Sequence, residues 1–169
     1  SESLSMALLN QVENPFETDD DEIAVENPEL EGVWETVTSN SQTLASGNAQ
    51  WGDDWTASFQ NDGFATMACH GWMLGIIEGN AEGVEGWDMA NVFPDGGGNW
   101  GGSYLTIPSQ GDHIEEAKKV AQWLTAPEQQ AKAFEAKGPF PSQVEALSAP
   151  EITGAVNPYF NDAPIGEIY

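Results

Sequence analysis

A glycine-rich segment near the middle of the chain places the strongest local constraint on how this sequence can fold. Five of the seven residues from Gly96 to Gly102 are glycine, and they surround Asn99 and Trp100. Glycine adds no side chain to packing and loses the most backbone entropy on folding, so such a run is tolerated where the backbone must approach another group closely. Two interpretations stay open: a turn whose indole packs into the core, or a loop that presents Trp100 to a ligand.

Short strand patterns alternate with helix patterns along the chain. Apolar and β-branched runs predict strands at 64–70, 87–93 and 103–107. An i, i+3, i+4, i+7 rhythm predicts a helix over 28–37, with Asn27 as N-cap, and a shorter helix carries Trp55 and Phe59 after a cap at Asp53 or Asp54. Alternation of this kind predicts an α/β fold rather than a sandwich or a helical bundle.

The clearest helical signal is a hairpin between Asp112 and Gly138. Asp112 and Glu115 have the spacing of an N-cap and N3 pair, and a second helix begins near Pro127 and ends at Gly138. The inner face of the first helix is predicted to consist of Ile114, Ala117, Val120, Ala121 and Leu124. Short, proline-separated segments follow, and the sequence from Pro164 to the end predicts no terminal helix.

The charge of the chain excludes two classes of partner. Its 169 residues include 28 acidic side chains, 4 lysines and no arginine, which gives a formal net charge of −24. Nucleic acids and anionic membrane surfaces both require a basic protein surface, so we expect neither as a partner. No apolar run is long enough to cross a membrane.

The sequence assigns no catalytic residue, metal or cofactor. A chain with 28 acidic residues always contains some carboxylate pair, so abundance does not identify a glycosidase site. His70 and His113 have no metal-ligand spacing with each other or with Cys69, and the acidic run 19–22 lacks the glycine and the spacing of an EF-hand loop. Cys69 is the only cysteine, so it forms no internal disulfide, and we expect it to be a small buried residue of a strand.

Seven tryptophans are many for a chain of this length. Trp34 and Trp123 lie on predicted helix faces, where core or semi-exposed packing explains them. The other five lie in or beside turns: Trp51, Trp55, Trp72, Trp87 and Trp100. Sugars offer C–H patches to aromatic faces and hydroxyls to polar groups, and Asp53, Asp54, Asn99 and Ser103 provide such groups nearby. The pattern favours carbohydrate binding, although Trp87 fits better as packing.

The order of several motifs resembles a known family. FQNDGFATMACHGWMLGI, a segment ending in VFP, GGGNWGGSYLTIP and HIEEAKKVAQWLTAPEQQAKAFEAKGPFPS follow one another as in the second half of extracellular family 1 sugar-binding proteins of ABC importers. The likeness runs from about Val33 onward, and is greatest to the actinobacterial branch associated with cellobiose and related oligosaccharides. Members are more than twice as long, so this chain resembles an incomplete fragment of a receptor.

The resemblance implies a fold and a cellular role. The fold would be the type II, maltose-binding-protein-like arrangement of periplasmic binding proteins, in which two α/β lobes close on a sugar. Residues 1–97 and 139–169 would belong to the C-terminal lobe, and 98–138 would form a crossover strand and the helical hairpin of the N-terminal lobe. The complete protein would hand an oligosaccharide to a membrane permease from the outer face of the membrane, lipid-anchored, or from the periplasm, and would not be an enzyme.

The resemblance also implies ligand contacts. It places Trp72 in stacking contact with the sugar, and Trp100 closing over it beside Gly101, Gly102 and Ser103. Weaker candidates are Trp51, Asp53 and Trp55, because Asp53 also fits a helix cap and Trp55 an inward position. Two alternatives remain open: a carbohydrate-active hydrolase domain, and a fragment with no activity of its own. An incomplete sheet would also allow self-association through exposed strand edges.

Overall fold

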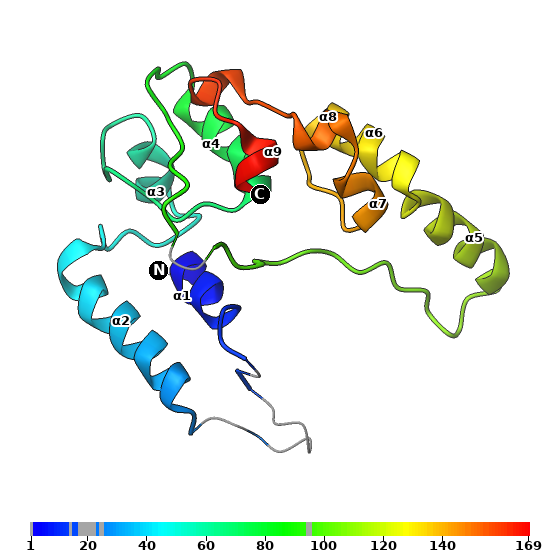
Figure 1. The fold of residues 1–169 in the computed structure, drawn as a ribbon, viewed down its shortest axis with the longest axis horizontal. Coiled ribbons are helices and arrows are strands. Elements are labelled where there is room, and N and C mark those ends of the chain that lie inside the picture. Colours follow the sequence, from blue (N-terminus) through cyan, green and yellow to red (C-terminus); the bar gives the residue numbers. More distant parts are fainter. Residues whose placement is uncertain (1, 14, 17–22, 24–25, 94–95) are drawn as a thin grey trace. The chain divides into compact units, whose positions relative to one another are not determined.

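The computed structural model describes residues 2–13, 15–16, 23, 26–93 and 96–169 (Figure 1). The chain forms two compact units, of which unit 1 contains 1–70, 79–84 and 91–100, and unit 2 contains 71–78, 85–90 and 101–169. The chain therefore passes between the units five times, and three of these passages fall at a glycine: Gly71, Gly79 and Gly101. The two units are compact regions of this chain and are not identified with the lobes of a receptor. The predicted division into 1–97, 98–138 and 139–169 therefore stays a prediction.

Unit 1 begins with two helices that pack on each other, α1 (Glu2–Leu9) and α2 (Pro28–Leu44). The predicted N-cap of α2 is confirmed, because the Asn27 side chain accepts a hydrogen bond from the backbone N–H of Glu29 at 2.9 Å. Helix α3 (Asp53–Ser58) follows, but its N-cap is Gly52. The predicted cap at Asp53 or Asp54 is wrong: both lie inside the first turn, where their charge is still favoured by the helix dipole.

Unit 2 contains the predicted helical hairpin together with several short helices. The hairpin consists of α5 (Ile114–Leu124) and α6 (Pro127–Lys137), and Gly138 ends it in the left-handed conformation with φ of 78°. Its N-cap is His113 rather than the predicted Asp112. The short elements are η1 (Gly71–Met73), α4 (Leu74–Ala81, whose last turn falls in unit 1), α7 (Val144–Leu147), α8 (Pro150–Thr153), η2 (Pro158–Phe160) and α9 (Ile165–Ile168).

The three predicted strands are wrong for the described residues, none of which belongs to a β-strand. Segments 64–70, 87–93 and 103–107 are irregular, although an isolated bridge joins Asn157 to Ala163. A strand pattern needs a neighbouring strand to pair its N–H and C=O groups, and the described chain provides none for these segments. The described residues therefore do not show the α/β class or the strand position of Cys69, which is only half-buried. They also contain no strand edge for the predicted self-association, which stays a prediction.

Two further predictions about helices also need correction. The chain does end in a short helix, α9, whose core residue Ile165 is buried. The predicted inner face of α5 is not buried, since Val120 is 57% exposed and Leu124 is 47% exposed. Its periodicity predicted the helix correctly, but among the described residues its apolar side is only partly covered, with Ile114, Ala117 and Ala121 half-buried.

Unit 2 depends on a close backbone approach between α8 and α9. Gly166 donates a hydrogen bond from its N–H to the carbonyl of Ala155 at 3.0 Å, and a Cβ at this position would collide with the carbonyl oxygens of Ile152 and Thr153. Ile152 and Ile165 are both buried at this junction. Only glycine allows the two short helices to meet in this way.

We therefore expect Gly166→Ala to destabilise unit 2 by about 2 kcal/mol, because the methyl group would displace backbone rather than a flexible side chain. The measurement is the thermal or urea unfolding midpoint, followed by circular dichroism. Gly75→Ala is the matched control, since Gly75 lies in α4 with no atom within 4 Å of the added Cβ. That change should be neutral or stabilising by up to about 1 kcal/mol, and equal midpoints for the two variants would contradict the close approach.

Candidate functional site

Four aromatic side chains of unit 1 form a continuous series of ring contacts around α3. Trp51 lies 5.1 Å from Trp55 between ring centroids, Trp55 lies 4.7 Å from Phe59, and Phe59 lies 5.2 Å from Phe64. The last two pairs are edge-to-face, the arrangement that the ring quadrupole favours. The series connects the surface of unit 1 to its core.

The predicted ligand residues of this series differ in exposure. Trp55 is 7% exposed and belongs to the core, whereas Trp51 is exposed at the outer end. Trp51 also has φ of 70°, a left-handed conformation that a bulky residue seldom adopts. Asp53 is exposed in the first turn of α3. Trp51 and Asp53 are thus placed where a ligand can reach them, and the buried ring of Trp55 packs against Trp51.

Trp100 stacks on His70, with ring centroids 4.5 Å apart and an angle of 6° between the planes. His70 is buried, and its burial lowers the pKa of the imidazole below the ordinary value of 6.5. One face of Trp100 therefore packs inside unit 1, as the first interpretation of the glycine-rich segment predicts. Burial in this stack favours the neutral form of the imidazole over the charged form.

The first half of the glycine-rich segment lies against the end of α1. A Cβ on Gly98 would collide with the backbone of Ala7. The Asn10 amide donates to the carbonyl of Asn99 at 2.7 Å, and the Gln11 amide donates to the carbonyl of Gly96 at 2.6 Å. Close backbone approach thus explains the glycine at position 98.

The second half of the segment lies beside Trp72 in unit 2. Gly101 and Gly102 have φ of 86° and 141°, values that side chains other than glycine rarely adopt. A Cβ on Gly101 would lie 3.9 Å from Trp72 Nε1, so the indole edge and this backbone are neighbours. Trp72 lies in η1 and is 36% exposed, and Ser103 is exposed.

The predicted ligand residues are consequently divided between the units. Unit 1 contains Trp51, Asp53, Trp55 and Trp100, of which the structure brings Trp51 and Trp55 together. Unit 2 contains Trp72, Gly101, Gly102 and Ser103, of which it brings Trp72 and Gly101 together. Each group has one exposed indole, Trp51 just before α3 in unit 1 and Trp72 in η1 in unit 2.

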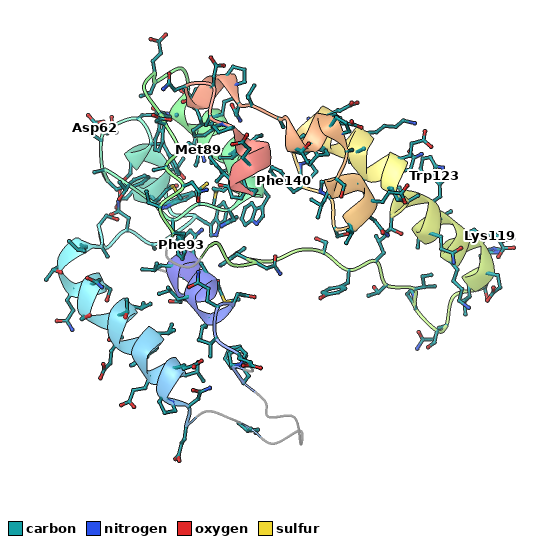
Figure 2. All side chains as sticks on the ribbon, viewed as in Figure 1. Asp62, Met89, Phe93, Lys119, Trp123 and Phe140 are labelled. Carbon is teal, nitrogen blue, oxygen red and sulfur yellow. The ribbon has the colours of Figure 1, made fainter. Side chains whose placement is uncertain are left out.

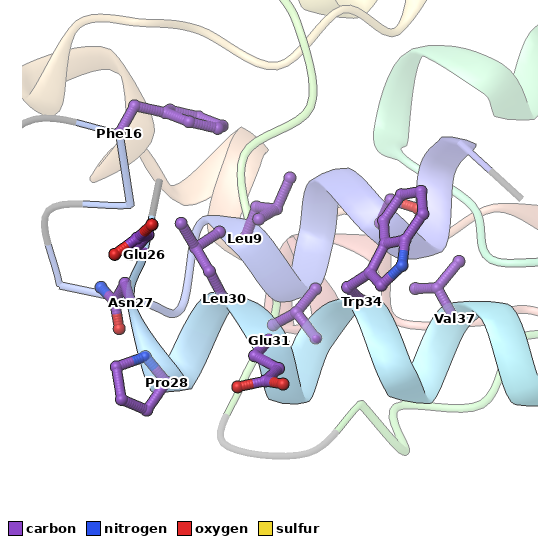
Figure 3. A pocket seen from close by; sticks show the side chains of 11 residues that line it. Leu9, Phe16, Glu26, Asn27, Pro28, Leu30, Glu31, Trp34 and Val37 are labelled. Carbon is purple, nitrogen blue, oxygen red and sulfur yellow. The ribbon is translucent and has the colours of Figure 1, made fainter. Parts of the chain in front are cut away.

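Sequence reasoning did not predict an apolar groove between α1 and α2 (Figure 3). The groove has a volume of about 700 Å³. Figure 3 shows Leu9 of α1 on the side toward which Leu30 and Trp34 of α2 project. Trp34 is 70% exposed, which is more than the predicted core or semi-exposed packing allows. The helical rhythm of α2 identified these side chains but not that their face is only partly covered.

Two other kinds of site are absent from the part of the chain that the structure describes. Within those ranges no group of three or more His, Cys, Asp or Glu side chains is arranged to hold a metal ion. The described helices also include none that is both long and apolar enough to span a membrane.

Comparison with known families adds to this geometry. The family model for the bacterial extracellular solute-binding protein matches residues 2–158. The chain belongs to this family of solute-binding proteins. None of the curated proteins compared matches this solute-binding protein.

A solved structure supports the same assignment at the level of fold. The crystal structure described as an extracellular solute-binding protein of family 1 is 46% identical to this chain, with a TM-score of 0.82. The similarity covers 99% of this chain and 44% of the solved one. This solute-binding protein therefore has the fold of one part of that relative, and spans less than half its length.

The His70 stack gives this solute-binding protein a testable pH dependence. Because burial lowers the pKa of His70, the unfolded chain binds more protons at this ring than the native chain. The contribution of the His70 imidazole to the free energy of unfolding is fully present above pH 6.5. It is lost as the pH falls through the lowered pKa of the native state.

We expect an NMR titration to give His70 a pKa below 6.5, with His70→Gln used to assign its resonance. The difference in unfolding free energy between the native chain and His70→Gln should shrink as the pH falls. A measured pKa at or above 6.5, or a difference independent of pH, would show that the ring is not held neutral by burial.

Proposed function

We propose that this solute-binding protein binds an oligosaccharide and delivers it to the membrane permease of an ABC importer. The observation that carries the proposal is the position of Trp72, a partly exposed indole at the start of a helix beside the backbone of Gly101. Family membership supports a binding role rather than catalysis. A flat aromatic face next to unobstructed backbone suits a pyranose ring, which stacks through its C–H face and hydrogen-bonds at its edge.

The remaining candidate residues have complementary roles in this proposal. Gly101 and Gly102 leave room for a sugar to approach the backbone, and Ser103 offers a hydroxyl. In unit 1, exposed Trp51 offers a second stacking face supported by Trp55, and Asp53 offers a carboxylate to sugar hydroxyls. Trp100, which is half-buried and stacks on His70, is the further aromatic contact of the proposal.

The finer features of the proposal concern the longer protein. We propose a two-lobed receptor of the type II, maltose-binding-protein-like kind, in which 98–138 belong to the N-terminal lobe and the rest of this chain to the C-terminal lobe. Its ligand would be a cellobiose-like oligosaccharide. Its place would be the outer face of the membrane, through a lipid anchor, or the periplasm, in keeping with the extracellular description of the family.

The test is a tryptophan-fluorescence titration with cellobiose, other β-1,4 and α-1,4 gluco-oligosaccharides, and xylo-oligosaccharides. We expect saturable quenching or a blue shift with at least one series. Trp72→Ala should weaken binding by about 2–4 kcal/mol, because a stacking aromatic anchor contributes on that scale. Trp123→Ala is the matched control: Trp123 is exposed on α5 (Figure 2), outside the proposed site, and should leave the affinity unchanged.

Each of the other outcomes of this titration would contradict one part of the proposal. Unchanged affinity in a folded Trp72→Ala variant would mean that Trp72 is not the anchor. Release of shorter sugars during the titration, detected by chromatography, would indicate the hydrolase alternative. A response from the longer protein but not from this chain would mean that this part has no binding activity of its own.

A further inference from the structure

Trp51 combines an exposed indole with a backbone conformation that tryptophan rarely adopts. Its side chain is 56% exposed and its φ is 70°. We propose that Trp51 is a sugar-binding platform of unit 1, which stacks on one pyranose ring whether or not Trp72 is present. This inference rests on the proposed oligosaccharide function and deepens it, because it assigns the recognition of one sugar ring to unit 1 alone.

The backbone around Trp51 forms a turn that normally contains glycine at this position. The N–H of Gly52 donates a hydrogen bond to the carbonyl of Ala49 at 3.0 Å, which closes a turn of four residues. Trp51 is the third residue of this turn, and Gln50 before it has a negative φ, the combination found in a type II turn. Because a side chain is strained at the third position, glycine or asparagine is preferred there. A tryptophan at this position therefore lowers the stability of the turn.

The other residues with positive φ show how unusual Trp51 is. Among the described residues other than glycine, they are Asp62, Glu82, Asn161 and Asp162. Three of these are Asp or Asn, which tolerate the left-handed conformation, and Glu82 directly follows α4, where a helix often ends in it. Trp51 is the aromatic member of this described group. Strained residues of this kind concentrate at ligand-binding and active sites, which directs attention to the exposed indole.

A purely structural role explains the ring contact of Trp51 but not its exposure. Trp51 precedes Gly52, the N-cap of α3, and its ring centroid lies 5.1 Å from that of Trp55, much as a hydrophobic staple fixes the entry of the chain into a helix. A staple is an apolar contact, and a smaller side chain such as leucine would make it with Trp55. More than half of the Trp51 side chain is exposed instead. The exposed part of the indole is what we assign to the ligand.

The residues around Trp51 hold its indole in place and add polar groups. Trp55, against which it packs, is buried and contacts the core residue Phe59 edge to face. The carboxylates of Asp53 and Asp54 are exposed in the first turn of α3, where they can accept hydrogen bonds from sugar hydroxyls. A side chain that is already held in position loses little conformational entropy on binding. A pyranose ring offers its C–H face to such an indole and its hydroxyls to the polar groups beside it.

Two other exposed indoles of the chain provide an internal comparison. Trp34 is 70% exposed on α2, and Trp123 is 59% exposed on α5. Both lie in helices with ordinary backbone conformation, and neither makes a ring contact with another described aromatic side chain. The proposal therefore separates Trp51 from indoles that are merely exposed. Sugars should affect Trp51 and leave Trp34 and Trp123 unchanged.

The test is an NMR titration of the isotope-labelled chain, in which each indole N–H gives its own signal. Cellobiose is added from about 0.1 mM to about 50 mM, a range that includes weak binding of a single ring. Trp51→Phe and Trp72→Phe assign the two signals. We expect the Trp51 signal to move saturably in the unmodified chain and also in the Trp72→Ala variant, while the signals of Trp34 and Trp123 stay in place. Sorbitol, which has hydroxyls but no ring, should move none of them.

Substitutions of Trp51 in the Trp72→Ala background separate the aromatic face from the turn. Trp51→Tyr keeps a flat ring and should retain binding, followed by the backbone N–H signal of Gly52. Trp51→Leu keeps apolar contact with Trp55 but has no flat face, and should weaken binding by about tenfold or more. Trp51→Gly should unfold at a higher temperature than Trp51→Ala, because both lack the ring and only glycine adopts this φ without strain. Equal midpoints would contradict the strained turn, and equal binding by the Tyr and Leu variants would contradict stacking.

The titration distinguishes failure of this inference from failure of the proposed function. A Trp72 signal that responds to cellobiose while the Trp51 signal does not would overturn the inference and leave the proposed function standing. The opposite result would support the platform in unit 1 and contradict Trp72 as the anchor. Silence of both signals would contradict the inference and sugar binding by this chain together. Equal movement of the Trp34 and Trp123 signals would show a general effect on exposed indoles, and would also overturn the inference.

Discussion

The close approach of two backbones, at Gly98 against Ala7, determines how unit 1 is put together. It brings the glycine-rich segment against the end of α1, where Asn10 and Gln11 bond to its carbonyl groups. Further along the same segment, the ring of Trp100 stacks on the ring of His70. A side chain at position 98 would therefore disturb the backbone contact with Ala7, the two hydrogen bonds from Asn10 and Gln11, and the stacking of Trp100 on His70.

The small size of the two cores explains why so much apolar surface remains. Unit 1 is built around the ring series that ends at Phe59 and Phe64, and unit 2 around short helices joined at Gly166. Among the described residues, neither α2 nor α5 has a buried side chain. The formal net charge of −24 makes copies of this chain repel one another.

Local signals predicted the helices well and the strands badly. Asn27 and Gly138 lie at helix ends as predicted, because a cap depends on bonds within a few residues. The N-caps predicted at Asp53 or Asp54 and at Asp112 instead fall on the neighbouring residues Gly52 and His113. Tyr104 and Leu105 have a strand pattern, but a strand also needs a partner that local sequence does not supply. The same limit applies to the site. The sequence placed Trp51, Trp55, Trp72 and Trp100 alike in or beside turns. The exposure of Trp51 and Trp72, the burial of Trp55 and the stacking of Trp100 depend on tertiary contacts.

The five passages between the units have a consequence for synthesis on the ribosome. Unit 1 cannot be completed until residue 100 has been added, yet segments of unit 2 have been made before then. Domains that fold one after another from the N-terminus need contiguous sequence, and this chain does not offer it. Neither unit corresponds to a contiguous stretch that a simple truncation would release, so unit 1 is expected to fold only after two segments of unit 2 have also been made.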